Sequence, residues 1–290
     1  MHYALLLVTA GLLTLQKITQ KRFNTACPSG ALLLSGMISL CAMLCFMAVA
    51  TATRAWEWQS HLILPALGFG LSYAAATVFV VLAIKCGSLA KTTLITSYSL
   101  LVPAFAGLII LREPIGIPMI AGMILLVLSL WLTNHRKKTA DAPKEKISLK
   151  WLVFVLLGFV GNGMCSTVQK LAPHYLGADV NLTLSTIAAL GLSTVVLIAA
   201  SFLTKETDLK TTLRVGGPLS LFCGLFNGAV NDLAIYLNQF IPASVMFPVL
   251  SAGELILIVP YSLLVRRERF NAKQWAGFAV GVVSVVLLNL

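Results

Sequence analysis

Two carboxylates lie inside long apolar segments of the sequence, where an ionisable group needs a physical reason to be. Glu254 lies between Pro248 and Pro260 in FPVLSAGELILIVP. A charge in the middle of a membrane span costs roughly 2.5 to 3.5 kcal/mol on insertion scales, so intramembrane acids often mark ion or proton sites. Each proline also frees a backbone carbonyl, which is tolerated where it faces protein or a wet cavity. We predict a cation or proton site at Glu254, the alternative being a protonated or paired carboxyl that serves packing.

The second carboxylate, Asp232, is accompanied by amides in FNGAVNDLAIYLNQ. Asn227 and Asn231 are four residues apart and share one helix face, and Asp232 lies about 100° round the helix from Asn231. Amide donors and acceptors beside a carboxylate suit a polar solute or an alkali cation. Interhelical hydrogen bonding, which contributes about 0.6 kcal/mol per contact on average, explains the same residues equally well.

Two lysines, Lys17 and Lys170, each follow a glutamine near the end of an apolar segment. Lysines near span ends usually extend to the lipid headgroups, and this is the simpler interpretation. The sharper one makes Lys17 and Lys170 gates, or contacts for an anion, at opposite ends of a pathway. Arg112 and Glu113 lie in a turn between apolar segments, where local charge pairing and topology explain them.

The sequence contains no motif for enzyme chemistry. It has no H-E-x-x-H pair, nucleophile elbow or P-loop, so we expect neither an enzyme nor a cofactor. The six cysteines include no C-x-x-C pair, and the four histidines lie at the ends of apolar segments or in loops, so no metal site is expected. Without a nucleotide site, active transport would have to use an ion or solute gradient.

The composition predicts that these residues are carried by membrane-spanning helices. The chain has 290 residues, of which 58% are hydrophobic and 11% charged, whereas soluble domains carry roughly 25% charged residues. About 20 apolar residues cross a bilayer core. Apolar runs predict ten spanning helices, at 2–20, 29–50, 61–84, 91–111, 114–134, 151–170, 180–203, 215–238, 242–265 and 272–290.

An internal repeat divides these helices into two halves. When the second half is shifted by 155 residues, Arg267-Glu268 falls on Arg112-Glu113 and Ser284 falls on Ser129. An odd number of spans per half makes the halves enter the membrane from opposite sides, as in many secondary transporters. We therefore expect an all-α integral membrane protein with two inverted five-helix repeats, residues 1–134 and 151–290, joined by the polar basic linker 135–150.

The repeat also aligns milder polar residues of the first half with the acids of the second. Thr77 falls opposite Asp232, and the negative charge is therefore confined to one half. An acidic cavity of this kind favours a cationic or zwitterionic solute, or proton coupling, over an anion. The first-half residues that we expect to line the same cavity are Ser72, Tyr73, Tyr98 and Ser99.

Basic residues predict the orientation. Of the 21 lysines and arginines, 18 fall in or beside the loops that follow the odd-numbered helices, and only Arg54, Arg112 and Lys170 fall on the other side. The side that is rich in basic residues is normally cytoplasmic. This predicts a cytoplasmic 135–150 linker and both termini outside a bacterial cell membrane. The formal net charge of +11 is thus explained by topology, and no nucleic-acid partner is expected.

The ends of the two halves, LREPIGIPMIAGMILLVLSL (111–130) and RRERFNAKQWAGFAVGVVSVVL (266–287), resemble the drug/metabolite transporter superfamily. The segment IPASVMFPVLSAGE (241–254) also resembles the start of the ninth helix of its EamA-like ten-helix carriers. The resemblance implies a carrier with a central cavity between the halves, self-sufficient as a monomer or weak homodimer. It does not imply a substrate, since members move amino acids, cations, sugars, nucleotides and drugs. We predict a secondary transporter that moves a small metabolite or drug-like solute by alternating access, with a proton or sodium as the coupling ion. A flippase for a lipid-linked substrate is the alternative.

Overall fold

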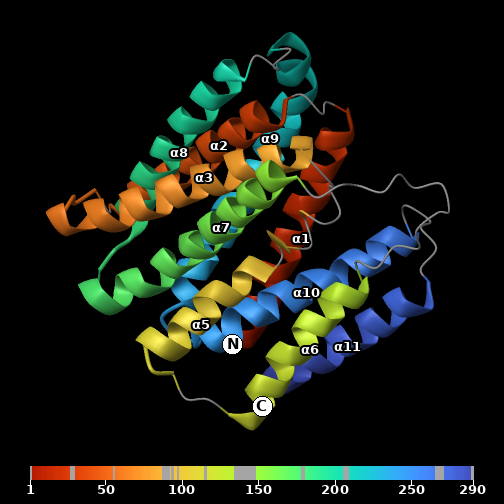
Figure 1. Ribbon diagram of the computed structural model, residues 1–290. Coiled ribbons are helices and arrows are strands. Elements are labelled where there is room, and N and C mark those ends of the chain that lie inside the picture. Colours follow the sequence, from red (N-terminus) through yellow and green to blue (C-terminus); the bar gives the residue numbers. More distant parts are fainter. Residues whose placement is uncertain are drawn as a thin grey trace.

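The computed structural model describes residues 2–26, 30–54, 56–86, 92, 95–96, 98–113, 116–133, 148–177, 180–204, 209–264 and 271–288, and their regular structure is entirely helical (Figure 1). The α-helices are α1 (His2–Ala26), α2 (Ala31–Thr53), α3 (Ile63–Cys86), α5 (Leu101–Ile110), α6 (Ile117–Thr133), α7 (Leu149–Leu176), α8 (Thr183–Leu203), α9 (Leu209–Leu237), α10 (Ala243–Leu264) and α11 (Ala272–Leu288). Short 3-10 turns, η2 (Ser60–Leu62) and η3 (Tyr98–Leu100), precede α3 and α5.

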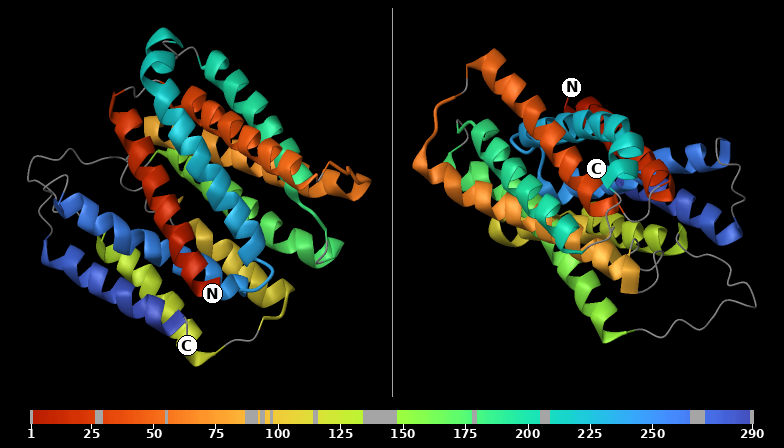
Figure 2. Two further views of the ribbon diagram at one scale, coloured as in Figure 1. Left: turned by 180° about the vertical axis from the view of Figure 1, so that it is seen from behind. Right: turned by 90° about the horizontal axis from the view of Figure 1, so that it is seen from above.

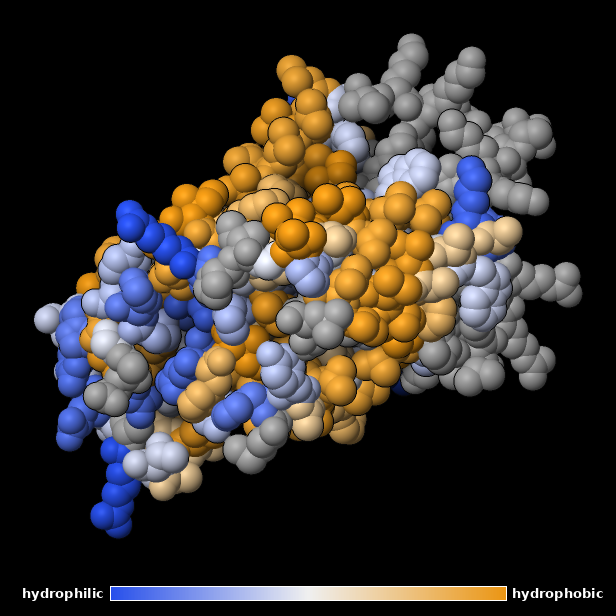
Figure 3. Space-filling view, turned by 90° about the horizontal axis from the view of Figure 1, so that it is seen from below, coloured by the Kyte–Doolittle hydropathy of each residue, from blue (hydrophilic) through white to orange (hydrophobic). Residues whose placement is uncertain are grey.

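Most of these helices expose apolar side chains, as a membrane protein requires. Five segments among the described residues are long and apolar enough to cross a bilayer, namely 31–53, 60–86, 149–176, 183–203 and 212–237. Viewed from below, the molecule presents a broad apolar surface, with hydrophilic residues gathered mainly toward one end (Figure 3). Exposing such a large apolar surface to water is unfavourable, whereas lipid covers it. The all-helical fold is therefore that of a multi-pass membrane protein.

The helices differ from the predicted spans mainly at their ends. Both α1 and α7 extend six residues beyond the predicted ends, to Ala26 and Leu176. The prediction followed the apolar run, whereas the backbone hydrogen bonds that define a helix also continue through polar residues. The predicted span 91–111 is less regular, since the described part of it consists chiefly of η3 and the ten-residue α5. Residues 135–147 of the predicted 135–150 linker lie outside the described part, and α7 already begins at Leu149.

Helices that the repeat aligns pack against each other in antiparallel pairs, α2 on α8, α5 on α10, and α6 on α11. The α6–α11 pair has reciprocal bonds between aligned residues. The Ser129 hydroxyl donates to the Gly277 carbonyl at 2.7 Å, and the Ser284 hydroxyl donates to the Gly122 carbonyl at 2.8 Å. In a two-fold arrangement, a residue of one element contacts the same position that its counterpart contacts in the other element, as these two serines do.

The other large contacts between the halves also occur in matched sets. Helix α1 packs on α9 and α10, as α7 packs on α3 and α5, and α2 packs on α9 as α3 packs on α8. Small residues allow the α2–α9 approach, because a Cβ built on Gly224 would lie 2.3 Å from the Cβ of Cys41. The two chain ends lie at the same end of the bundle (Figures 1 and 2).

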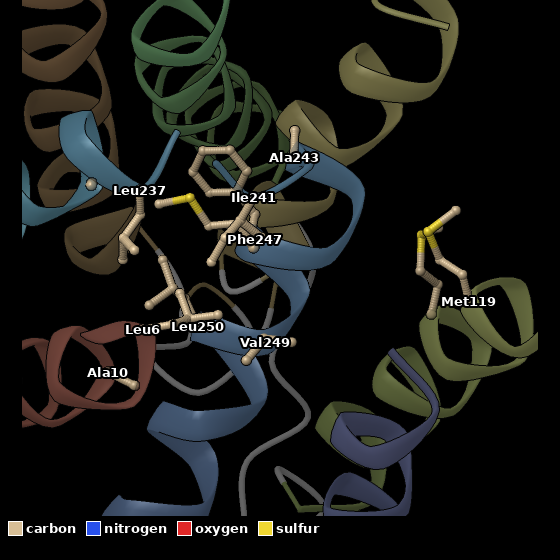
Figure 4. Close-up of a cluster of buried hydrophobic side chains, with 12 residues drawn as sticks. Leu6, Ala10, Met119, Leu237, Ile241, Ala243, Phe247, Val249 and Leu250 are labelled. Carbon is tan, nitrogen blue, oxygen red and sulfur yellow. The ribbon is translucent and has the colours of Figure 1, made fainter. Parts of the chain in front are cut away.

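A cluster of twelve buried apolar residues packs where α1, α9 and α10 meet, close to the turn that joins α9 to α10 (Figure 4). Leu6 of α1 lies against Leu250 of α10, and Met119 comes from α6. Leu237 and Met246 have no exposed surface. This cluster fills the interior near the end of the bundle that carries His2.

Candidate functional site

Glu254 forms an ion pair with a residue of the other half. Its Oε2 atom lies 2.6 Å from the Nζ atom of Lys17, which comes from α1, and the two side chains are 15% and 45% exposed. Helix α10 continues through both flanking prolines, and close packing of Gly253 on Ala10 brings α1 and α10 together. The structure thus unites two predicted site residues, and places an ammonium group on the carboxylate predicted to bind one.

The predicted amides form a cluster in the interior. Asn231 Nδ2 donates to the carbonyl and to Oδ1 of Asn227, at 2.8 and 3.1 Å, and Gln169 Nε2 of α7 donates to Asn231 Oδ1 at 2.8 Å. Tyr73 of α3 lies beside Asn227 and beside Ser39 of α2. Four helices therefore contribute to this amide cluster, which comprises Ser39, Tyr73, Gln169, Asn227 and Asn231.

Two of these residues, Ser39 and Gln169, were not predicted as site residues. Gln169 had a signal in the sequence, since the Gln-Lys pair at 169–170 aligns with the one at 16–17. Gln169 also lines a pocket between α3, α7, α8 and α9, together with Phe69, Val168, Ser185 and Ile235. The amide cluster is therefore in contact with a pocket that is largely apolar.

Asp232 does not join the amides. Its side chain is exposed, on the outer face of α9 that also carries Leu225 and Tyr236 with 46% and 38% exposure. The helical step of about 100° from Asn231, which the sequence already indicated, turns the carboxylate out of the interior. Any role of Asp232 in solute binding would therefore require a different arrangement of α9.

The predicted residues of the first half mostly bond to neighbouring helices. Ser99 is fully buried, donates to the Thr96 carbonyl at 2.6 Å, and accepts a bond from Asn162 Nδ2 of α7 at 2.5 Å. The Tyr98 hydroxyl donates to the Val127 carbonyl of α6 at 3.1 Å. Ser72 lies where α3 approaches Gly161 of α7. Ser99 is the position aligned with Glu254. At this position the first half has a neutral hydrogen bond to α7, whereas the second half has the ion pair between Glu254 and Lys17.

Lys170 lies in a second polar group, near the end of the bundle that carries His2. Its Nζ atom donates to the carbonyls of Asn238 and Ile241 at 2.9 and 2.8 Å, and lies 3.7 Å from Glu113 Oε1. Glu113 in turn accepts bonds from the backbone nitrogens of Ala243 and Ser244 at 2.8 and 3.0 Å, and from the Ser244 hydroxyl at 2.7 Å. We call Glu113, Lys170, Ser244 and these backbone groups the Glu113 network.

Charge is balanced among the paired groups described so far. Lys17 compensates Glu254, and Lys170 compensates Glu113, while Asp232 faces outward. The described residues include no group of three or more potential metal ligands. Burying a net charge is costly, so a charged solute entering this interior must either bring its own counter-charge or displace one partner of an existing pair.

Comparison with known proteins gives one family and one fold. The pattern of the EamA-like transporter family matches residues 149–290. No curated protein matches the chain. Among solved structures, one crystal structure with 14% sequence identity covers 98% of this chain and 94% of its own, with a TM-score of 0.76. At that identity the likeness shows a shared fold alone.

Proposed function

Residues 149–290 belong to the EamA-like transporter family, as the resemblance predicted, and from this premise we propose that the chain is a secondary transporter that moves a small solute by alternating access. The family and the helical membrane fold point to transport and away from catalysis. The solute, the driving gradient and the mechanism are our proposal, developed from the contacts described above.

We propose that ten spans form two inverted five-helix repeats, 1–134 and 151–290. Two observations support this arrangement. Aligned helices run antiparallel to each other, and aligned residues exchange equivalent bonds, Ser129 with Gly277 and Ser284 with Gly122. Two inverted halves give the same pathway two related conformations, which is the basis of alternating access.

The observation that carries the proposed function is the Lys17–Glu254 pair. Its 2.6 Å contact joins α1 to α10, which belong to different halves of the chain. A carboxylate that already holds an ammonium group is chemically suited to hold the ammonium group of a solute instead. Because Lys17 is 45% exposed, water can solvate its ammonium group when it leaves the carboxylate. A cationic or zwitterionic solute would thereby separate α1 from α10 as it binds.

The amide cluster is the second part of the proposed solute site. Gln169, Asn227 and Asn231 supply donors and acceptors without net charge, next to a largely apolar pocket. The pocket holds only about 20 Å³, whereas small-molecule sites measure roughly 300 to 1,000 Å³. We therefore propose that a solute enters only when the helices around the pocket move apart. Together with Glu254 the amide cluster suits a metabolite or drug-like amine.

Coupling follows from the same pair. A proton or a sodium ion that binds Glu254 would also release Lys17, so either ion can drive the change that the solute drives. We propose that the protein lies in the bacterial cell membrane with its termini outside, because 18 of 21 basic residues favour that orientation. The two halves complete the pathway within one chain, so a monomer or weak homodimer suffices.

Thermal stability of the purified protein tests the proposal with amines, amino acids, sugars and nucleosides. A ligand at a hundredfold its Kd stabilises the folded protein by about 2.7 kcal/mol. We expect an amine to stabilise the wild type, Glu254→Gln to lose this response, and Lys17→Met to respond at lower amine concentrations because no internal ammonium competes. Glu57→Gln, which removes an exposed loop carboxylate, is the matched control and should behave as the wild type.

The signs of these effects separate the alternatives. Equal responses of the wild type and Glu254→Gln would assign the carboxylate to packing and leave the amide cluster as the site. A weaker response of Lys17→Met would refute the competition between the lysine and the solute. If none of these soluble compounds stabilises the protein, a flippase for a lipid-linked substrate replaces the carrier of soluble solutes.

A further inference from the structure

The turn after α5 directs the side chain of Glu113 toward the start of α10. Arg112 has a φ of 50°, a left-handed conformation that a residue with a side chain adopts only at a cost. The backbone nitrogens of Leu111 and Glu113 both donate to the Gly107 carbonyl, at 3.1 and 3.3 Å. A Cβ on Gly107 would lie 2.6 Å from Glu113 Oε2 and 2.8 Å from Ala243 Cβ. A glycine and a strained turn thus make room for this carboxylate.

The carboxylate closes the start of α10. The first backbone nitrogens of a helix have no partner within it, and a side-chain oxygen from the residue just before the helix usually satisfies one of them. In α10 that residue is Pro242, which has no side-chain oxygen. Glu113 takes its place from 130 positions earlier in the chain, by accepting the bonds of Ala243 and Ser244. The favourable end of the helix dipole adds to this attraction.

Lys170 bonds the turn between α9 and α10, just before the helix start that Glu113 contacts. Its two bonds to the carbonyls of Asn238 and Ile241 hold the residues between α9 and α10, and its contact with Glu113 joins them to the first half. The Lys170 and Glu113 side chains are only 9% and 10% exposed. The aligned Lys17 is 45% exposed, so the two ends of the bundle differ in closure at matched positions.

From this geometry we propose that Glu113 is a releasable latch that holds the His2 end of the transport pathway closed. The proposal rests on the proposed alternating access. A cap supplied by neighbouring residues stays with its helix in every conformation, whereas a cap supplied by the other half holds only while the halves lie together. When this end opens, Glu113 leaves α10, and its donors and Lys170 become accessible to water, which replaces the lost bonds.

Accessibility of a buried thiol tests the latch without any knowledge of the solute. Met246 is fully buried beneath the start of α10, so Met246→Cys, in a background whose native cysteines are replaced, reports opening of this end to a water-soluble maleimide in detergent. We expect Glu113→Gln to increase the labelling rate about tenfold or more, because the closed state loses a charged acceptor bound by three donors.

Two controls separate the latch from general loosening. Glu57→Gln removes a carboxylate from an exposed loop, and Ser129→Ala removes a buried bond that joins α6 to Gly277 of α11 and does not involve α10. Neither should change the rate by more than about twofold. An unchanged rate in Glu113→Gln, or an equal rise in Ser129→Ala, overturns the latch.

A milder variant covers the case in which Glu113→Gln does not fold. Ser244→Ala removes one of the three donors to the carboxylate and should raise the labelling rate several-fold, so an unchanged rate in this variant also overturns the proposal. Failure of the solute screen with a positive labelling result would refute the proposed solute site and leave the latch in place.

Discussion

Replacing Lys170 with methionine removes one ammonium group and keeps a chain of similar length. Two carbonyl oxygens, those of Asn238 and Ile241, lose their charged donor, and the buried Glu113 loses its nearest cation. Removing one partner of a buried pair costs roughly 3 to 5 kcal/mol because the other remains uncompensated. Three further donors still hold Glu113, so the low end applies. We expect Lys170→Met to lose about 3 kcal/mol of unfolding free energy.

The repeat supplies a matched control for this change. Lys17→Met is the same substitution at the aligned position, but Lys17 is 45% exposed and its one described partner is Glu254. Glu254 is only 15% exposed, but solvent reaches the pair from the lysine side, and ion pairs open to solvent contribute about 0 to 1 kcal/mol. Lys17→Met should therefore cost less than about 1 kcal/mol. The two variants should differ about thirtyfold or more in the unfolding equilibrium constant, at about 1.4 kcal/mol per factor of ten.

Unfolding by increasing SDS in mixed micelles, followed by tryptophan fluorescence, measures both variants against the wild type. The transition midpoints should order as wild type, Lys17→Met and then Lys170→Met. A loss in Lys17→Met as large as that in Lys170→Met would show that burial does not distinguish the two lysines. A loss below about 0.5 kcal/mol in Lys170→Met would refute the energetic role of the Glu113 network.

Two further predictions concern the packing between the halves. Gly224→Ala should lose about 1 to 3 kcal/mol by overpacking against Cys41, whereas Gly217→Ala on the same helix, with no atom within 4 Å of the added Cβ, should be neutral or slightly stabilising; SDS unfolding of both variants measures the contrast. Ser129→Ala and Ser284→Ala remove equivalent bonds, so each should cost about 0.6 kcal/mol. Unequal losses in the same assay would contradict the proposed two-fold relation between α6 and α11.

Apolar segments could be predicted from the sequence because lipid requires long uninterrupted hydrophobic stretches, and most helices lie within a few residues of their predicted positions. The alignment of Ser129 with Ser284 could also be found, because polar residues rarely match by chance in apolar segments. Helical periodicity also predicted that Asp232 and Asn231 face different directions, because successive residues of a helix are about 100° apart.

Partners across the bundle could not be predicted in this way. Lys17 and Glu254 are 237 positions apart, and Glu113 bonds residues 130 and 131 positions later. The turn interpretation of Glu113 expected local charge pairing with Arg112, but the left-handed turn at Arg112 directs the carboxylate to α10 instead. Tertiary packing decides such contacts, so spacing along the chain carries no record of them.

The two lysines connect the repeat to the proposed mechanism. Lys17 and Lys170 are aligned in sequence, yet their surroundings differ. Lys17 is 45% exposed and paired with a carboxylate in the middle of α10. Lys170 is 9% exposed and bonded to the turn that precedes α10. Equivalent halves in equivalent conformations would give matched residues matched surroundings. Under the proposed inverted repeat, we interpret this difference as a more closed His2 end, while Glu268, the counterpart of Glu113, lies outside the described residues. Under alternating access the two exposures must change in opposite directions, since opening the His2 end releases Lys170 as the other end closes around Lys17.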